Sequence, residues 1–285
     1  MRGKNDSVSV RCVRKESPVI QQTQIVPDGL VGHWRLDEES GITAVNSANP
    51  GTNDGTVSGT DFDTDSVTGL TGGAMNFDGV DDFVDLGSSA DLSFGGQDPF
   101  TLFAWVKPKS LGGVAISKYG SSTSLRQYMM YFSGSGLFGC LREVNPWTVW
   151  STSRVQIDVW TSVACVYDGS ILRIFINGVE EASAAMGSIP NSLGTPVIIG
   201  STTTGSHMEG SIDDVRIYDR ALTEAEIREI YDARDGNLRY NTNVRAAKYF
   251  DGEEWVAAGP QKYVPNAVAF GGTSESLSRG ADLTG

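Results

Sequence analysis

The sequence predicts an all-β fold, built as a two-sheet antiparallel sandwich, on three observations. Glycine supplies 34 of the 285 residues and only 20% of the residues are charged, so turns are frequent and long charged helices are disfavoured. Short alternating or apolar runs recur over residues 30–218, separated by Gly, Asn, Asp and Ser. Two turn dipeptides, Asp168-Gly169 and Asn177-Gly178, each lie between β-prone runs. Together these features are typical of a sandwich.

The expected strands are short and are bounded by turn-forming residues. In chain order they are residues 30–36, 74–77, 83–86, 100–106, 127–132, 160–167, 172–176, 197–199 and 212–218. Asp168-Gly169 and Asn177-Gly178 tolerate the positive φ of a type I′ turn. We therefore expect a double hairpin, with three consecutive antiparallel strands from residue 160 onward.

One short helix is predicted near the end of this region, over residues 223–234. Thr223 and Glu226 form the pattern of a capping box, in which each side chain accepts from the other residue's backbone amide. Leu222 before the cap is placed to pack on Ile227 as a hydrophobic staple. Asp235-Gly236 ends the helix, which we expect to close the domain.

The charge balance bears on partners and cofactors. The chain carries 22 Lys plus Arg against 35 Asp plus Glu, a net charge of −13, and no stretch gathers the basic residues into a stripe. Nucleic acid is therefore not expected as a partner. The surplus of carboxylates suits calcium, which binds to Asp, Asn and backbone oxygens. No apolar run approaches the length of about 18 residues typical of a spanning helix, so no membrane span is predicted.

The three cysteines, Cys12, Cys140 and Cys165, fit neither a disulfide scaffold nor a zinc site, because no C-x-x-C pair occurs. Cys165 lies in an apolar run, where a free thiol commonly acts as a small core hydrophobe. The sequence leaves open whether Cys140 and Cys165 form a bridge.

Five ordered motifs carry a family resemblance. They are residues 30–41, 76–84, 101–107, 160–178 and 210–222. In this order they resemble the laminin-G-like jelly-roll family, a branch of the concanavalin A-like lectins and glucanases. The resemblance implies a two-sheet jelly roll, and the fold by itself decides no activity.

The flanks suggest a division of the chain into domains. Residues 8–14 are similar to the last strand of C-type-lectin-like domains related to formylglycine-generating enzymes, and residues 238–256 resemble small β-hairpin modules of bacterial surface and phage tail proteins. Residues 266–285 repeat the pattern of residues 73–94. We expect a remnant of an upstream domain and a linker at 1–29, the jelly roll at 30–234, a β-hairpin module at 235–262, and the truncated start of a second laminin-G-like repeat at 263–285. This last segment is too short to bury a core, so we expect it either to be disordered or to self-associate by adding a strand to a neighbour.

The resemblance also implies a structural calcium that ties the first strand, a middle loop and the last strand. The best candidate ligand is Asp214, followed by Asp37 and Asp78, with Asp213 as a further candidate. Strand alternation places Asp213 and Asp214 on opposite faces, so both are not expected to bind the ion. The alternative is that these carboxylates only cap turns. A D-x-D-x-D string at 61–65 lacks the Gly and Glu of a calcium loop and is interpreted as a solvated loop.

A candidate ligand-binding region follows residue 141. Trp147 and Trp150 lie in a polar stretch around a proline, where at least one ring can remain exposed to stack on a sugar face. The alternative is that one or both rings fill the core. Trp34, Trp105 and Trp160 lie within apolar runs and are assigned to the core. The proposed flanking ligand contacts are Arg126, Tyr128, Tyr131 and Arg142.

No catalytic residue is predicted. The E-x-D-x-E strand of concanavalin A-like glucanases is absent, as are H-E-x-x-H and G-x-S-x-G. The favoured hypothesis is a non-enzymatic binding or adhesion module of a larger extracellular protein of a bacterial or phage surface, stabilised by calcium and binding glycans or surface proteins. The alternatives are a structural repeat that assembles filaments or virion tail parts, and a divergent glycoside hydrolase.

Overall fold

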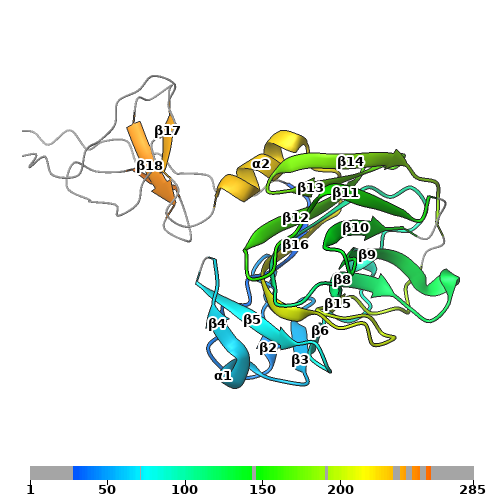
Figure 1. Ribbon diagram of the computed structural model, residues 1–285, viewed down its shortest axis with the longest axis horizontal. Coiled ribbons are helices and arrows are strands. Elements are labelled where there is room, and N and C mark those ends of the chain that lie inside the picture. Colours follow the sequence, from blue (N-terminus) through cyan, green and yellow to red (C-terminus); the bar gives the residue numbers. More distant parts are fainter. Residues whose placement is uncertain are drawn as a thin grey trace, which may run out of the picture.

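The computed structural model describes residues 28–70, 72–142, 146–189 and 192–233, and the backbone of three strands at 238–241, 246–250 and 255–257. Two antiparallel eight-stranded sheets stack face to face (Figure 1). The predicted jelly-roll sandwich is confirmed.

The first sheet, sheet A, is built around the long strands β7 and β16. From one edge to the other it contains β14 (Val179–Ala185), β13 (Ile171–Ile176), β12 (Thr161–Tyr167), β7 (Phe100–Pro108), β16 (Glu209–Tyr218), β5 (Gly73–Asp78) and β4 (Ser66–Thr68). Strand β1 (Leu30–Trp34) pairs with the second half of β16, on the side where β5 pairs with the first half.

The second sheet, sheet B, contains β11 (Thr148–Arg154), β10 (Leu137–Leu141), β9 (Arg126–Phe132), β8 (Val114–Tyr119), β15 (Ile198–Ile199), β6 (Phe83–Asp85), β3 (Gly55–Ser58) and β2 (Thr43–Ala44). The sequence analysis missed β8, β10 and β11, three of the four strands in one half of this sheet, and it also missed β2 and β3 in the other half. Short helical turns lie in the loops, namely α1 (Phe62–Asp65) and two 3₁₀ turns, Ala90–Leu92 and Thr123–Leu125.

The core lies between the sheets and receives every second residue of the long strands. On β7, for example, Phe100, Leu102 and Ala104 point inward, while Phe103 and Trp105 point to the outer face of sheet A. This alternation is the pattern expected of antiparallel strands with two distinct faces.

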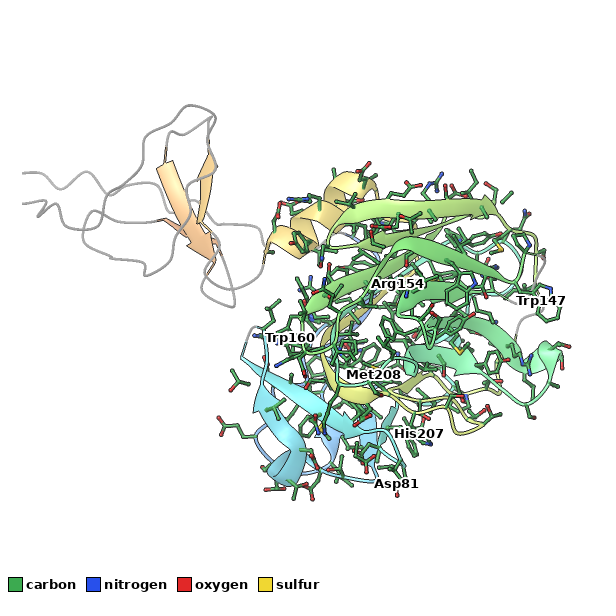
Figure 2. The ribbon with its side chains drawn as sticks, viewed as in Figure 1. Asp81, Trp147, Arg154, Trp160, His207 and Met208 are labelled. Atoms are coloured by element: carbon green, nitrogen blue, oxygen red, sulfur yellow. A yellow bond between two sulfur atoms is a disulfide. The ribbon has the colours of Figure 1, made fainter. Side chains whose placement is uncertain are left out.

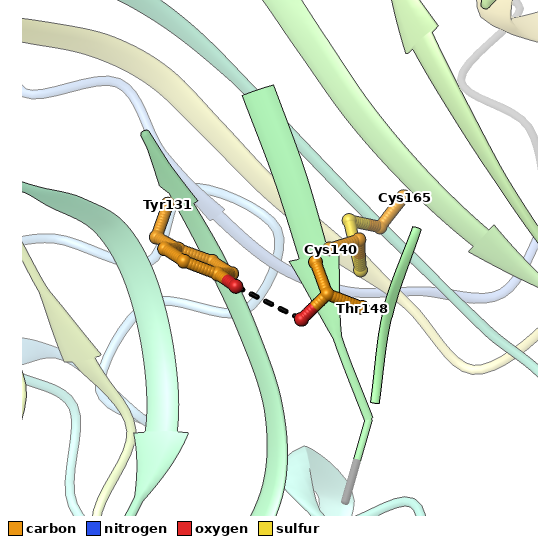
Figure 3. Close-up of a disulfide and its surroundings, with 4 residues drawn as sticks. All are labelled: Tyr131, Cys140, Thr148 and Cys165. Carbon is orange, nitrogen blue, oxygen red and sulfur yellow. Dashed lines mark hydrogen bonds between the residues drawn. A yellow bond between two sulfur atoms is a disulfide. The ribbon is translucent and has the colours of Figure 1, made fainter. Parts of the chain in front are cut away.

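A disulfide crosses the core. Cys140 on β10 of sheet B bonds to Cys165 on β12 of sheet A, with the two Cα atoms 6.1 Å apart, and both cysteines are fully buried (Figure 3). The sequence left open whether these two cysteines pair, and the structure shows that they do. Because the bridge joins opposite sheets, it fixes their stacking directly.

The predicted double hairpin is present as β12, β13 and β14. Asn177 and Gly178 both have positive φ, as a type I′ turn requires. In the other turn only Gly169 has positive φ, and the Asp168 carboxylate instead accepts hydrogen bonds from the backbone amides of Ser170 and Ile171. The type I′ interpretation therefore holds for the second turn alone.

The predicted helix is α2 (Glu224–Asp232), with the Thr223–Glu226 capping box complete. It lies against the outer face of sheet A, beside β13 and β14 (Figure 1). Leu222, Ile227 and Ile230 join Phe103 and Trp105 in a second buried apolar cluster there. Among the described residues, no helix has the length and apolar composition needed to cross a membrane.

A separate three-stranded sheet contains β17 (Leu238–Asn241), β18 (Ala246–Phe250) and β19 (Trp255–Ala257). It falls within the segment predicted as a β-hairpin module. Residues 1–27 of the predicted upstream remnant and linker at 1–29, and the whole truncated repeat at 263–285, lie outside the described residues.

Candidate functional site

The outer face of sheet B carries apolar and aromatic side chains on four neighbouring strands. We call this face the sheet B platform, and it consists of Val114, Tyr119, Met129, Tyr131, Leu141, Thr148 and Trp150, of which Val114, Met129 and Leu141 are buried and Trp150 is exposed. Strand register sets the order, since Val114 faces Tyr131, Tyr131 faces Gly139, and Gly139 faces Trp150 across successive strands. In the next row Met129, Leu141 and Thr148 are cross-strand neighbours.

Trp150 is the most prominent residue of the platform. Its side chain leans from edge strand β11 over Gly139 on β10, and it meets the Tyr131 ring edge-on with centroids 4.9 Å apart. The Tyr131 hydroxyl forms a 2.8 Å hydrogen bond with Thr148 Oγ1 (Figure 3). Trp150 is 37% exposed, so one of the two predicted ligand-binding indoles lies on the surface.

Trp147 lies just before β11 and is 59% exposed. Figure 2 shows it projecting at one end of the molecule, far from Trp160. The expectation that at least one of these rings avoids the core is confirmed, and both do. Trp34 and Trp105 are buried and Trp160 packs against the outer apolar cluster of sheet A, as predicted.

Two predicted ligand contacts are wrong. Arg142 is fully buried, donates to the carbonyl oxygens of Phe94 and Gly96, and stacks with its guanidinium 4.0 Å from the Tyr167 ring centroid. Burial lowers the pKa of Arg142 to about 10. Tyr128 is also fully buried, and its hydroxyl donates to the Leu92 carbonyl oxygen. Inward alternation on β9 turns Tyr128 away from the platform, and Arg142, the residue that follows β10, also points inward.

Arg126 lies at the rim of the platform. Its guanidinium stacks 4.2 Å from the Tyr119 ring centroid, and its Nε donates to the Gly120 carbonyl oxygen. On the side toward β15, Ser117 donates to the Ser201 carbonyl oxygen and Thr203 donates to the Tyr119 carbonyl oxygen. The loop after β15 therefore borders the platform on that side. On the other side β11 is the edge strand of sheet B, and its Thr152 and Ser153 amides donate to Glu181 of β14.

The four predicted calcium ligands do not meet at one point. Asp78 ends β5, whereas Asp37 contacts the start of that strand through the Gly73 amide. At about 3.4 Å per residue, the ends of this strand are about 17 Å apart. One ion cannot contact both Asp37 and Asp78, so a single ion that ties all three segments through these residues is wrong.

A β-bulge changes the predicted orientation of Asp213 and Asp214. The β16–β7 register shifts between Asp213 and Arg216, and Asp214 has a φ of 51°. Ile212 and Val215 are successive core residues, so both carboxylates lie between two inward positions and neither enters the core. The prediction that they occupy opposite faces is therefore wrong, because the bulge interrupts the alternation.

Asp214, the favoured calcium ligand, lies in an ion-pair network. It accepts two hydrogen bonds of 2.9 Å from the Arg216 guanidinium, and one of its oxygens lies 2.5 Å from His33 Nε2. Burial acts to raise the pKa of Asp214, but Arg216 and His33 outweigh it and hold that pKa well below its usual range. Burial and Arg216 lower the pKa of His33. Arg216 and His33 already provide the hydrogen bonds and positive charge that stabilise the ionised Asp214 carboxylate. This disfavours a calcium ion at Asp214.

Asp37 and Asp213 converge on the glycine-rich turn before β5. Asp37 accepts from the Gly73 amide and Asp213 accepts from the Leu70 amide. A Cβ on Gly72 would lie 2.7 Å from an Asp37 oxygen, and a Cβ on Gly69 would lie 2.7 Å from an Asp213 oxygen. Burial raises the pKa of Asp37 despite its hydrogen bond to Gly73. Two carboxylates from distant strands thus contact this turn, and Asp37 also pairs with Arg35, whose Nε lies 2.9 Å from Asp37 Oδ2.

Asp78 belongs to a different group. With Asp81 and Asp82 it forms a cluster whose carboxylate oxygens lie within 4.8 Å of one another. Asp78 accepts from the amides of Val80 and Asp81, and Asp82 accepts from the Asp78 amide. These contacts are those of carboxylates that cap a turn. The D-x-D-x-D string behaves similarly, since Asp61 caps α1 through the Thr64 amide.

A family model described as the concanavalin A-like lectin/glucanases superfamily, of the laminin G type, matches residues 78–228. This match covers more than half of the chain, and the chain belongs to that family. Human usherin is 27% identical over 151 residues, or 46% of this chain, and rat usherin is 27% identical over 191 residues, or 59% of it. The match spans only 3% and 4% of the length of these relatives.

Solved structures share the fold at low identity. The binding domain of Paraclostridial Mosquitocidal Protein 1 has a TM-score of 0.58 at 11% identity, covering 78% of this chain and 63% of that chain. Domain 4 of the extracellular arabinanase AbnA from Geobacillus stearothermophilus, in complex with arabinotriose, has a TM-score of 0.51 at 19% identity, covering 71% and 98%. Trypanosoma rangeli sialidase has a TM-score of 0.53 at 14% identity, covering 72% and 33%. Binding domains and enzymes both use this fold.

Proposed function

We propose that this chain is a non-catalytic binding module of a larger extracellular protein, and that the sheet B platform binds neutral glycans. The observation that carries the proposal is the exposed Trp150 ring, laid over Gly139 and braced by Tyr131. An indole held on a rigid strand offers a sugar ring a flat apolar surface at little cost in side-chain entropy.

The chemistry of the platform favours binding over hydrolysis. Glycosidases place two carboxyl groups about 5 to 10 Å apart across the scissile bond. None of the platform residues is a carboxylate, and the Thr148 and Tyr131 hydroxyls offer only neutral hydrogen-bonding groups. With a net charge of −13, the chain also disfavours strongly anionic glycans.

An extracellular setting is supported by the buried Cys140–Cys165 bridge, because structural disulfides persist mainly in oxidising compartments. The AbnA domain, described with an extracellular arabinanase and bound to arabinotriose, supports a glycan as the ligand class. The binding domain of Paraclostridial Mosquitocidal Protein 1, which has the same fold, supports a binding role.

The test is a glycan array probed with the wild-type protein and with Trp150→Ala and Trp147→Ala. We expect wild-type binding to neutral glycans, at least about tenfold weaker binding by Trp150→Ala, and a smaller loss for Trp147→Ala. Ile157→Ala, a change at an exposed apolar residue outside the platform, is the control and should bind normally. Unchanged binding by Trp150→Ala, no binding by the wild type, or release of reducing sugars from a polysaccharide would each contradict the proposal.

We also propose that a calcium ion stabilises the module at the turn before β5. Asp37 and Asp213 would hold it, together with backbone oxygens of the turn, since calcium takes six to eight oxygen ligands. The ion would compete with Arg35 for Asp37, which follows β1, would bind Asp213 on β16, and would tie β1, β5 and β16 together. This site differs from the Asp214-centred set expected from the sequence.

Calcium titration followed by thermal unfolding tests this second proposal. An ion that binds only the folded state raises the melting temperature, by an amount that grows with ion concentration. We expect Asp213→Asn to abolish that rise and Asp78→Asn to retain it. Isothermal titration of the wild type with calcium gives the binding directly. If neither calcium nor a chelator changes the melting temperature, the proposal of a stabilising calcium ion is contradicted.

A further inference from the structure

Gly139 occupies an unusual position in the sheet B platform. It lies in the middle of β10, between Tyr131 of β9 and Trp150 of β11 in the same cross-strand row. Glycine is unfavourable inside a strand, where it adds backbone entropy and no packing. The β10–β11 register shifts between Leu137 and Gly139, but Gly139 is not among the residues with positive φ, so its φ does not demand a glycine.

Space is what this position requires. A Cβ at Gly139 would lie 2.7 and 2.8 Å from two carbons of the Trp150 six-membered ring, and 3.0 Å from the Thr148 methyl group. Any side chain would therefore lift the indole off the sheet. Its displacement would also break the 4.9 Å edge-on contact with Tyr131.

We propose that Gly139 is the positioning residue of the glycan surface. Its missing side chain lets Trp150 lie across β10 with its outer face turned to solvent, beside Tyr131. The ligand class that fits is a neutral polysaccharide chain with one sugar ring stacked on the indole. This inference rests on the proposed function and adds the residue that sets the height and tilt of the stacking ring.

If Gly139 positions Trp150, replacing it should weaken glycan binding without lowering the stability of the fold. Valine favours strands more than glycine does, and the atoms it would displace belong to the far end of an exposed side chain. We therefore expect Gly139→Val to melt at the wild-type temperature or above it, while its binding falls by at least about tenfold. A residue with a purely structural role would shift both properties in the same direction.

Affinity electrophoresis of the full chain through gels containing arabinan, xylan or β-glucan is the measurement. The variants are Gly139→Val, Trp150→Ala and the double variant, with Gly134→Ala as the matched control, because a Cβ at Gly134 meets nothing within 4 Å. If Gly139 acts through Trp150, the double variant should bind no more weakly than Trp150→Ala alone. Acrylamide quenching of tryptophan fluorescence measures how accessible Trp150 is, when the signal of a Trp150→Phe derivative is subtracted. We expect Trp150 to be more accessible in Gly139→Val than in the wild-type protein.

The outcomes are distinguishable. Normal binding by Gly139→Val beside lost binding by Trp150→Ala would overturn the positioning role and leave the proposed function standing. Loss of binding in the double variant beyond that of Trp150→Ala would also overturn it, because Gly139 would then act independently of the indole. If the wild-type protein is retarded by none of the three polysaccharides, the proposed function and this inference fail together.

Discussion

The two outer faces of the sandwich carry similar aromatic residues but differ in how much of them solvent reaches. On sheet A, Trp105 is 2% exposed, because α2 covers it and Tyr231 stacks on it at 5.5 Å. On sheet B, Trp150 is 37% exposed, and the described residues place no helix over it. Aromatic residues on a sheet thus become core or exposed surface according to whether another element covers them.

The largest effect is expected from the covered face. Trp105→Ala should lower the free energy of unfolding by about 3 to 5 kcal/mol, because it empties a site packed between sheet A and α2. Urea denaturation measures the loss. Trp150→Ala should lower that free energy by less than about 1 kcal/mol, since an exposed residue leaves no cavity. Equal losses in the two variants would show that the faces are not distinct.

The second largest effect is expected from removing the disulfide that joins the two sheets. Cys140→Ala with Cys165→Ala should lower the free energy of unfolding by about 3 kcal/mol, as for a closed loop of this size. The sequence separation of 25 residues sets that size. Denaturation of the double variant against the wild type measures the effect. A reduced wild-type protein should match the variant, and a variant as stable as the oxidised protein would count against the bridge.

The two exposed indoles should differ in binding by a smaller factor. Trp150 is braced by Tyr131, whereas Trp147 is 59% exposed and has no ring contact among those found in the described residues. A preorganised ring loses less freedom on binding. We expect Trp147→Ala to weaken glycan binding about two- to fivefold, against at least about tenfold for Trp150→Ala. The reverse order on the glycan array would reassign the main stacking residue.

The smallest effect concerns the helix that covers sheet A. Hydrogen bonds from Arg220 lower the pKa of Glu226 from 4.5 to about 2 despite partial burial. Because the folded-state pKa is depressed, the stabilisation is present above about pH 4.5 and is lost as the pH falls toward 2. Glu226→Gln should flatten this part of the stability–pH curve and cost about 1 kcal/mol at neutral pH. Denaturation at several pH values checks it, with Glu224→Gln as control.

Much of the fold could be predicted because its signals are local. The capping box of α2 involves Thr223 and Glu226, and the type I′ turn needs only Asn177 and Gly178, so short patterns are enough. Strands such as β7 and β12 are nearly continuous apolar runs, because both faces of sheet A are covered at these strands. The pattern failed for β10, whose central Gly139 is typical of a turn, and for β11, which is polar and lies at an edge.

The candidate site was predicted only in part. The two indoles were found because they lie close together in a polar stretch. Tyr128 and Arg142 were assigned to the surface by residue type, yet Arg142 finds two carbonyl oxygens and an aromatic ring inside the core. Gly139 was missed, and the one available signal was a glycine inside an apolar run.

The sequence by itself determined that the chain folds as an antiparallel sandwich with a capped helix, because alternation and turn chemistry act over a few residues. The tertiary structure decided which carboxylates meet, which indoles stay exposed and which cysteines pair. Those outcomes depend on strand register, on the bulge at Asp213 and Asp214, and on the element that covers each face. They bring together residues far apart in the chain, and no local pattern encodes that proximity.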